Sequence, residues 1–377
     1  MRISRARWVR LSLILLANAL IFPFWIASGA AQSGRLVSVE SSTATSNFPD
    51  DMTFELSASV QGKIRKVDLV YQESSLATLE LLPGDFQQDN NQLTATAKAD
   101  LATYYVPAGI DLTYHWVVTF DDDAVQETDA SVVTWIDNRF EWDKREGAGV
   151  EVYSYDRSDK FMDFVMETAD KAVQDMIALY NPPKVLPIRI WLYESGKDFA
   201  GTQAANSQEW AAGAAYPSLQ VILGVIPKNS KSEVNRILPH EISHQILAQA
   251  TINPYNAPAT WIDEGLAVVA QIGGKDQYEG DVRDAYHKGE LISLRSLISS
   301  FPYDPSQASL AYGESYLVMQ FVLDQYGPES IQAIIAAYRD GNSQDEVIEK
   351  ALGMSIEELE QAWLDQFGQS SLDGLAA

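Results

Sequence analysis

Apolar and polar residues alternate along much of residues 35–138, in short runs separated by turn-rich stretches. The runs include RLVSVE, TFELSASV, KIRKVDLVY and LTYHWVVTF, and the intervening stretches include NFPDD and LPGD. A period of two places successive side chains on opposite faces of a strand. About seven such strands in about 100 residues predict an all-β sandwich of the immunoglobulin-like or fibronectin-like kind.

The pattern changes after a polar, glycine-containing segment at 137–150. Apolar residues recur at helical spacing in 159–181, and short apolar runs at 187–193 and 220–226 predict strands. Further helices are predicted at 231–250, 261–274, 309–327, 329–341 and 355–368. We therefore expect a multidomain chain, with the sandwich at 35–138 and an α+β domain at 140–370.

The first 31 residues predict export. The basic stretch MRISRARWVR precedes an apolar run, and SGAAQS then offers small residues for cleavage near Ala30 or Ala31. This is the outline of a secretory signal peptide. The apolar run is somewhat long, so an uncleaved anchor is the alternative. Both interpretations place the rest of the chain in a secreted or extracytoplasmic location.

Composition narrows the chemistry. The chain has no cysteine among its 377 residues, which excludes disulfides, thiolate nucleophiles and iron–sulfur clusters. Its formal net charge of −25 disfavours nucleic acid and anionic membrane surfaces as partners. Neither property defines a reaction or an oligomeric state.

Two of the four histidines lie one helical turn apart, in the string ILPHEISHQIL. His240 and His244 project about 40° apart on a helix, so both imidazoles can bind one metal ion. Glu241 lies on the adjoining flank, where its carboxylate can reach a water on that ion. Zinc needs a third protein ligand, and Glu264 in WIDEGLA follows His244 with nineteen residues between.

With these motifs, residues 140–370 resemble the gluzincin metallopeptidases, and most closely the bacterial extracellular peptidase MA-like proteins. The strings HEISH and WIDEGLA carry the resemblance, together with GAAYPSLQVILGV and YGESYLVMQFV. It implies a zincin-like, thermolysin-like domain that binds one zinc ion per chain through His240, His244 and Glu264.

The resemblance also implies catalytic roles. Glu241 would be the general base that takes a proton from the zinc-bound water and passes it to the leaving amine. A tyrosine or a histidine usually assists the oxyanion in these enzymes, and Tyr312 is our candidate, with Tyr316 as the alternative. The segment 209–220 would form the substrate-binding edge strand, with Gly213–Tyr216 at its centre. The Gly-Ala-Met-Glu-Asn string of aminopeptidases is absent, so the sequence does not indicate an aminopeptidase.

Several nearby residues have structural interpretations. Thr260 is a predicted helix N-cap, with Asp263 completing a capping box, and Asp263 can instead or also hydrogen-bond a ligand histidine. Pro239 lies inside a predicted helix, where it should cause a kink and leave the Asn235 carbonyl to find another partner. His115 is predicted to be an ordinary strand residue. His287 is predicted to lie at a solvated helix end, and a role as oxyanion donor is the alternative.

The sequence thus predicts an exported zinc metallopeptidase acting on a peptide or protein substrate. Two other functions remain open at this point. One is a cell-surface binding protein with a catalytically idle zinc site, although a purely structural site would have no use for Glu241. The other is an amidase that applies the same metal chemistry to non-peptide substrates.

Overall fold

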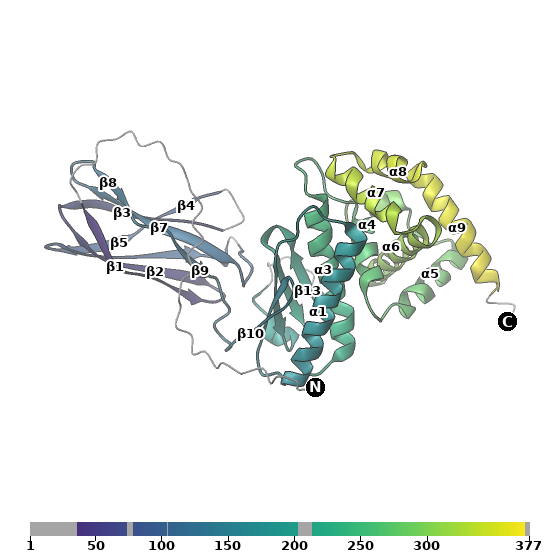
Figure 1. Ribbon diagram of the computed structural model, residues 1–377, viewed down its shortest axis with the longest axis horizontal. Coiled ribbons are helices and arrows are strands. Elements are labelled where there is room, and N and C mark those ends of the chain that lie inside the picture. Colours follow the sequence, from purple (N-terminus) through teal and green to yellow (C-terminus); the bar gives the residue numbers. More distant parts are fainter. Residues whose placement is uncertain (1–35, 74–77, 104, 203–212, 374–377) are drawn as a thin grey trace, which may run out of the picture. The chain divides into compact units, whose positions relative to one another are not determined.

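The computed structural model describes residues 36–73, 78–103, 105–202 and 213–373 (Figure 1). The predicted signal at 1–31 lies outside these residues. The chain divides into two compact units. The described part of the first comprises the residues up to Thr45, Met52–Ala99 and Asp111–Thr134. The second comprises Ser46–Asp51, Asp100–Ile110 and the chain from Trp135 onward.

The first unit is built from two β-sheets. One has the strand order β1 (Val37–Asn47), β2 (Asp51–Val60), β6 (Gln92–Asp100), β5 (Asp85–Asp89). The other has the order β4 (Glu80–Pro83), β3 (Ile64–Glu73), β7 (Asp111–Phe120), β8 (Val125–Glu127), and β9 (Ser131–Thr134) also pairs with β7. Alternate residues of β6 and β7 are buried, as the period of two predicts. The rings of Phe54 and Tyr114 meet between the sheets, with centroids 4.8 Å apart.

The second unit contains a five-stranded sheet of order β10 (Asp143–Glu146), β11 (Val150–Ser154), β12 (Ile188–Tyr193), β14 (Val221–Val225), β13 (Gly213–Tyr216). The central three strands are parallel, and the two edge strands are antiparallel to their neighbours. Strand β10 lies in the segment that the sequence presents as a polar linker. Cross-strand ion pairing stabilises β10, since Lys144 Nζ lies 2.6 Å from Glu151 Oε1 on β11. A strand held by charged side chains shows no alternation of apolar and polar residues, so the sequence pattern does not predict it.

Helices make up most of the remaining second unit. They are α1 (Asp159–Tyr180), α2 (Gly196–Phe199), α3 (Lys231–Thr251), α4 (Thr260–Ala270), α5 (Asp276–Lys288), α6 (Pro305–Tyr326), α7 (Pro328–Arg339), α8 (Gln344–Leu352) and α9 (Ile356–Asp373). Short 3₁₀ turns occupy Pro217–Leu219 and Leu294–Leu297. The pattern predicts no separate range for α5 and α8, which bury few residues, although it predicts a helix end at His287. The predicted helix 261–274 extends past the end of α4 at Ala270. Within the described residues, no helix has the combined length and apolarity needed to cross a membrane.

Helix α1 connects β11 to β12 and packs with α3, so the sheet and these helices share one core. Fully buried members of that core include Val152, Val165, Ile190, Ile222, Ile242 and Leu266. The core continues into α6 and α7 through residues such as Val318, Val322 and Ile334. Because α3 and α4 both bury apolar residues in this core, their polar faces are held in fixed positions.

A buried carboxylate lies in the same helical region. Glu314 on α6 has no exposed surface, and its two oxygens accept the Ile292 N–H at 2.9 and 3.2 Å. Burial raises the pKa of Glu314 to about 8, and the Glu360 carboxylate adds to the increase. The folded chain therefore retains a proton on this side chain at pH values where the unfolded chain has lost it.

This proton makes stability depend on pH. The contribution of Glu314 is fully present below about pH 4.5 and is lost as the pH rises through about 8. At about 1.4 kcal/mol per pKa unit, the loss in unfolding free energy is at most about 5 kcal/mol. Urea unfolding at about pH 5 and about pH 9 should therefore show a smaller loss for Glu314→Gln than for the wild type. Equal losses in both proteins would contradict this assignment.

Candidate active site

Helix α3 carries the HEISH string across the middle of the second unit. Its apolar residues Val234, Ile237, Leu238, Ile242 and Ile246 are buried in the core. The side chains of His240 and His244 lie on another face and retain 15% and 13% exposure. The helical period thus separates the packing residues from the residues that face the site.

The chain turns back after α3 through a short loop organised by Asn253. Its side-chain Nδ2 donates to the carbonyls of Thr251, Asn256 and Tyr338, and its Oδ1 accepts from the N–H groups of Tyr255 and Asn256. An asparagine whose side chain hydrogen-bonds the backbone groups of its own turn fixes the path of the backbone. This turn leads into α4, which runs beside α3 and carries Glu264.

A glycine sets the depth at which α4 packs. A Cβ added to Gly265 would lie 2.4 Å from the Ser315 carbonyl oxygen and 2.7 Å from Met319 Cγ, both on α6. The glycine therefore allows α4 to contact the α6 backbone directly. This packing explains why a glycine follows Glu264, which the sequence presents only as part of a motif.

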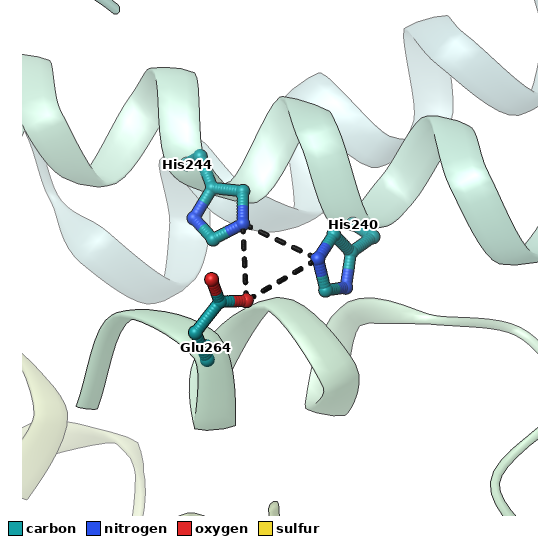
Figure 2. Close-up of side chains that lie close together, drawn as sticks. All are labelled: His240, His244 and Glu264. Carbon is teal, nitrogen blue, oxygen red and sulfur yellow. Dashed lines mark hydrogen bonds and ion pairs between the residues drawn. The ribbon is translucent and has the colours of Figure 1, made fainter. Parts of the chain in front are cut away.

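The three predicted ligand residues converge (Figure 2). The Nε2 atoms of His240 and His244 lie 3.2 Å apart, and Glu264 Oε2 lies 3.4 Å from each of them. Their potential ligand atoms all lie within 4.8 Å of one another. The two helices thus bring together the set of atoms that the spacing of nineteen residues predicts.

The other ring nitrogens are also engaged. His244 Nδ1 lies 2.6 Å from Asp263 Oδ1, which confirms that Asp263 can hydrogen-bond a ligand histidine. The predicted capping box is wrong, because α4 has Ala259 as its N-cap without a side-chain cap, and Thr260 is its first residue. His240 Nδ1 lies 3.0 Å from Gln271 Nε2. Sequence reasoning missed Gln271, although it follows Glu264 by seven residues, or two helical turns.

Charges in this buried cluster depend on one another. Burial would lower the pKa of His244, but the Asp263 and Glu264 carboxylates outweigh it and hold this pKa well above its usual value. Burial would raise the pKa of Glu264, while the two histidines lower it below its usual value. The cluster is therefore an arrangement of compensating charges, in which loss of one member leaves another buried and unpaired.

The donor set fits a zinc ion. Glu264 Oε2 is buried, and no described residue gives it a hydrogen bond of ordinary geometry. This acceptor faces two imidazole nitrogens, and a cation shared by all three would satisfy them together. Two histidines and one glutamate form the ligand set of many catalytic zinc sites, which keep a further position open for water.

Glu241 lies between α3 and the edge strand β13. Its side chain is 8% exposed, and burial raises the pKa of its carboxyl group. A Cβ added to Gly213 on β13 would lie 2.5 Å from Glu241 Oε1. The predicted edge strand is present at Gly213–Tyr216 as the outermost strand of the sheet in the described residues, and residues 209–212 lie outside them.

The end of this strand is fixed by a second tyrosine. Tyr216 Oη lies 2.6 Å from Tyr105 Oη, and Tyr105 donates to the Thr202 carbonyl. Tyr105 comes from Asp100–Ile110, which belongs to the second unit although it lies between two strands of the first in the sequence. No periodicity or motif in the sequence pointed to this contact.

The two candidate tyrosines of α6 point to different surroundings. The Tyr312 ring centroid lies 6.4 Å from that of His240, and its pKa is raised first by burial and then by Glu264 and Glu241. Tyr316 instead has Lys275 Nζ 5.4 Å from its ring centroid, and it faces the acidic side chains of α5. Of the pair, Tyr312 is therefore the one beside the predicted metal ligands.

The two remaining histidines lie away from the cluster. His115 is on β7 in the first unit, next to Glu127, as expected for a strand residue. His287 is exposed in the last turn of α5, where Gly289 ends the helix, as predicted for a solvated helix end. Neither brings a ligand to the site.

Comparison with known families gives one assignment. Residues 168–368 match the model of the peptidase MA superfamily. Because this match spans more than half of the 377 residues, the chain belongs to the peptidase MA superfamily. This membership and the His-His-Glu group support a zinc-dependent metallopeptidase. No curated protein matches the chain.

Solved structures resemble the chain only distantly. The M1 zinc metallopeptidase of Deinococcus radiodurans is 10% identical, over 84% of this chain and 90% of its own, with a TM-score of 0.38. A purple acid phosphatase from yellow lupin is 6% identical over 52% of this chain and 35% of its own, with a TM-score of 0.22. A putative polysaccharide deacetylase of Bacillus anthracis is 9% identical over 46% and 57%, also at 0.22. These TM-scores are too low to carry an argument.

The packing of Gly265 yields a direct test. Gly265→Ala places a methyl group against the α6 backbone, so α4 must shift and move Glu264 relative to the histidines. We expect a loss of about 1–3 kcal/mol in unfolding free energy from overpacking, together with weaker zinc binding. Gly280→Ala on α5 is the matched control, because its new Cβ meets nothing within 4 Å. Equal stability and zinc affinity in the two variants would contradict this role for Gly265.

Proposed function

We propose that the chain is an exported zinc-dependent metallopeptidase that hydrolyses peptide bonds, with one zinc ion held by His240, His244 and Glu264. The observation that carries the proposal is the convergence of three ligand atoms within 4.8 Å, with the Glu241 carboxylate beside the edge strand. Membership of the peptidase MA superfamily supports the same reaction class.

Zinc, when bound, supplies Lewis acidity that activates a water and polarises the scissile carbonyl. Glu241 is the general base, which takes the proton of the attacking water and delivers it to the leaving amine. Tyr312 donates its hydroxyl proton in a hydrogen bond to the developing oxyanion. The Asp263 carboxylate orients the His244 ring.

The substrate is a peptide or protein in an extended conformation. Strand β13 ends the sheet next to Glu241, so a peptide laid along it would pair with its backbone and present the scissile bond to the site. The small residues Gly213, Ala214 and Ala215 support this placement, because they leave room beside the backbone.

The finer organisation of the chain is also part of the proposal. Residues 1–31 direct export, so the chain acts in a secreted or extracytoplasmic location, free or held by an uncleaved N-terminal segment. The sandwich at 35–138 is of the immunoglobulin-like or fibronectin-like class, supported by its two sheets with alternating burial. The peptidase domain occupies 140–370.

The decisive variant is Glu241→Gln, which keeps the shape of the side chain and removes its basicity. Zinc content should stay unchanged, while peptide turnover should fall by about 100- to 10,000-fold, the usual contribution of general acid–base catalysis. Glu167→Gln, at an exposed position on α1, is the control and should retain full turnover. A wild-type chain that binds zinc and cleaves no member of a peptide library would contradict the proposal and favour a binding protein with an idle site.

A further inference from the structure

Gln271 contacts a predicted metal ligand at a place where its amide has no obvious structural purpose. Its side chain is 4% exposed, and its Nε2 lies 3.0 Å from His240 Nδ1. Its Oε1 is buried and has no hydrogen-bond partner in the described part of the chain. A buried amide oxygen without a donor is costly, so this orientation of the amide calls for an explanation.

The chemistry of His240 supplies one. A neutral imidazole that binds a metal through Nε2 carries its proton on Nδ1, and that nitrogen must then donate a hydrogen bond. An amide N–H cannot accept it. Turning the amide by 180° exchanges the positions of its oxygen and nitrogen and places Oε1 against Nδ1. The orphaned acceptor then becomes the acceptor that the ring needs.

The backbone next to Gln271 is held by a hydrogen bond to a carbonyl of α3. Pro239 has no N–H, so the Asn235 carbonyl lacks its partner within α3. The Ile272 N–H donates to this carbonyl at 3.1 Å, which confirms the prediction that Asn235 finds another partner. Two residues further on, Gly274 has φ +78° and packs against the aliphatic part of Arg236. The chain after α4 is thus attached to α3 at Asn235, five residues before His240.

We propose that Gln271 is a positioning residue for His240, and that its amide oxygen accepts a hydrogen bond from the Nδ1–H group of His240. The Asn235 carbonyl, which Pro239 leaves without a partner in α3, holds the backbone next to Gln271 in place. The proposal rests on the zinc site of the proposed function. The two histidines are then held differently, His244 by the Asp263 carboxylate and His240 by a neutral amide. The change Gln271→Glu keeps the acceptor, whereas Gln271→Leu, of similar size, removes it.

Zinc affinity, measured by competition with a chelator, tests this role without any substrate. Loss of such a partner of a ligand histidine typically weakens metal binding by about 10- to 100-fold, and we expect this for Gln271→Leu. Gln271→Glu should bind zinc at least as tightly as the wild type. Gln332→Leu on α7, which also loses an amide hydrogen bond, should leave zinc affinity unchanged.

Nuclear magnetic resonance of the zinc-loaded chain, with histidine labelled by ¹⁵N, gives a readout that a merely structural role would not move. The His240 Nδ1 proton should exchange slowly with water in the wild type and in Gln271→Glu, and faster in Gln271→Leu. The chain has four histidines, so the signals can be assigned.

Pro239→Ala tests the backbone part of the device. It returns an N–H that competes with Ile272 for the Asn235 carbonyl, so zinc binding should weaken although the helix itself gains a hydrogen bond. Unchanged zinc affinity in both Gln271→Leu and Pro239→Ala would overturn the inference, and a wild-type chain that binds no zinc would overturn it together with the proposed function. A chain that binds zinc without cleaving peptides would contradict the proposed function alone.

Discussion

The close approach of α4 to both α3 and α6 is the constraint on which the site depends. Glu264 can meet two histidines on α3 only if α4 lies alongside that helix, and α6 must then support α4 from behind. Gly265 makes this possible, because any side chain there would collide with the α6 backbone at Ser315. The same helix α6 places Tyr312 beside His240, so one packing contact fixes the position of the proposed carboxylate ligand and of the candidate oxyanion donor.

The site concentrates polar groups in apolar surroundings and satisfies them in pairs. Asp263 holds His244, Gln271 contacts His240, and Gly213 leaves room for the Glu241 carboxylate. Each pairing limits where a reacting group can lie, which is how a protein holds catalytic groups ready without reorganisation during the reaction. The free-energy cost of burying these charges is offset only while every member of the cluster is present, because loss of one member leaves its partner buried and unpaired.

The sequence predicted those parts of the fold that follow from periodicity and spacing. The helices that bury an apolar stripe, such as α1 and α3, begin and end within a residue or two of the predicted bounds. The ligands were accessible because a spacing of four and a spacing of nineteen are visible along the chain. Contacts between distant segments could not be predicted, because no spacing along the chain indicates them. Tyr105 meets Tyr216 across 111 positions, Gln271 meets His240 through a loop, and the polar strand β10 is stabilised by its neighbours.

The most direct test of this account is the zinc content of the purified chain beside a His244→Ala variant, measured by mass spectrometry after metal has been supplied to both. The account predicts about one zinc ion per chain in the wild type and loss of that zinc in the variant, because two protein ligands do not complete a catalytic zinc site. No zinc in the wild type, or equal zinc in both proteins, would contradict the claim that α3 and α4 together form a metal centre.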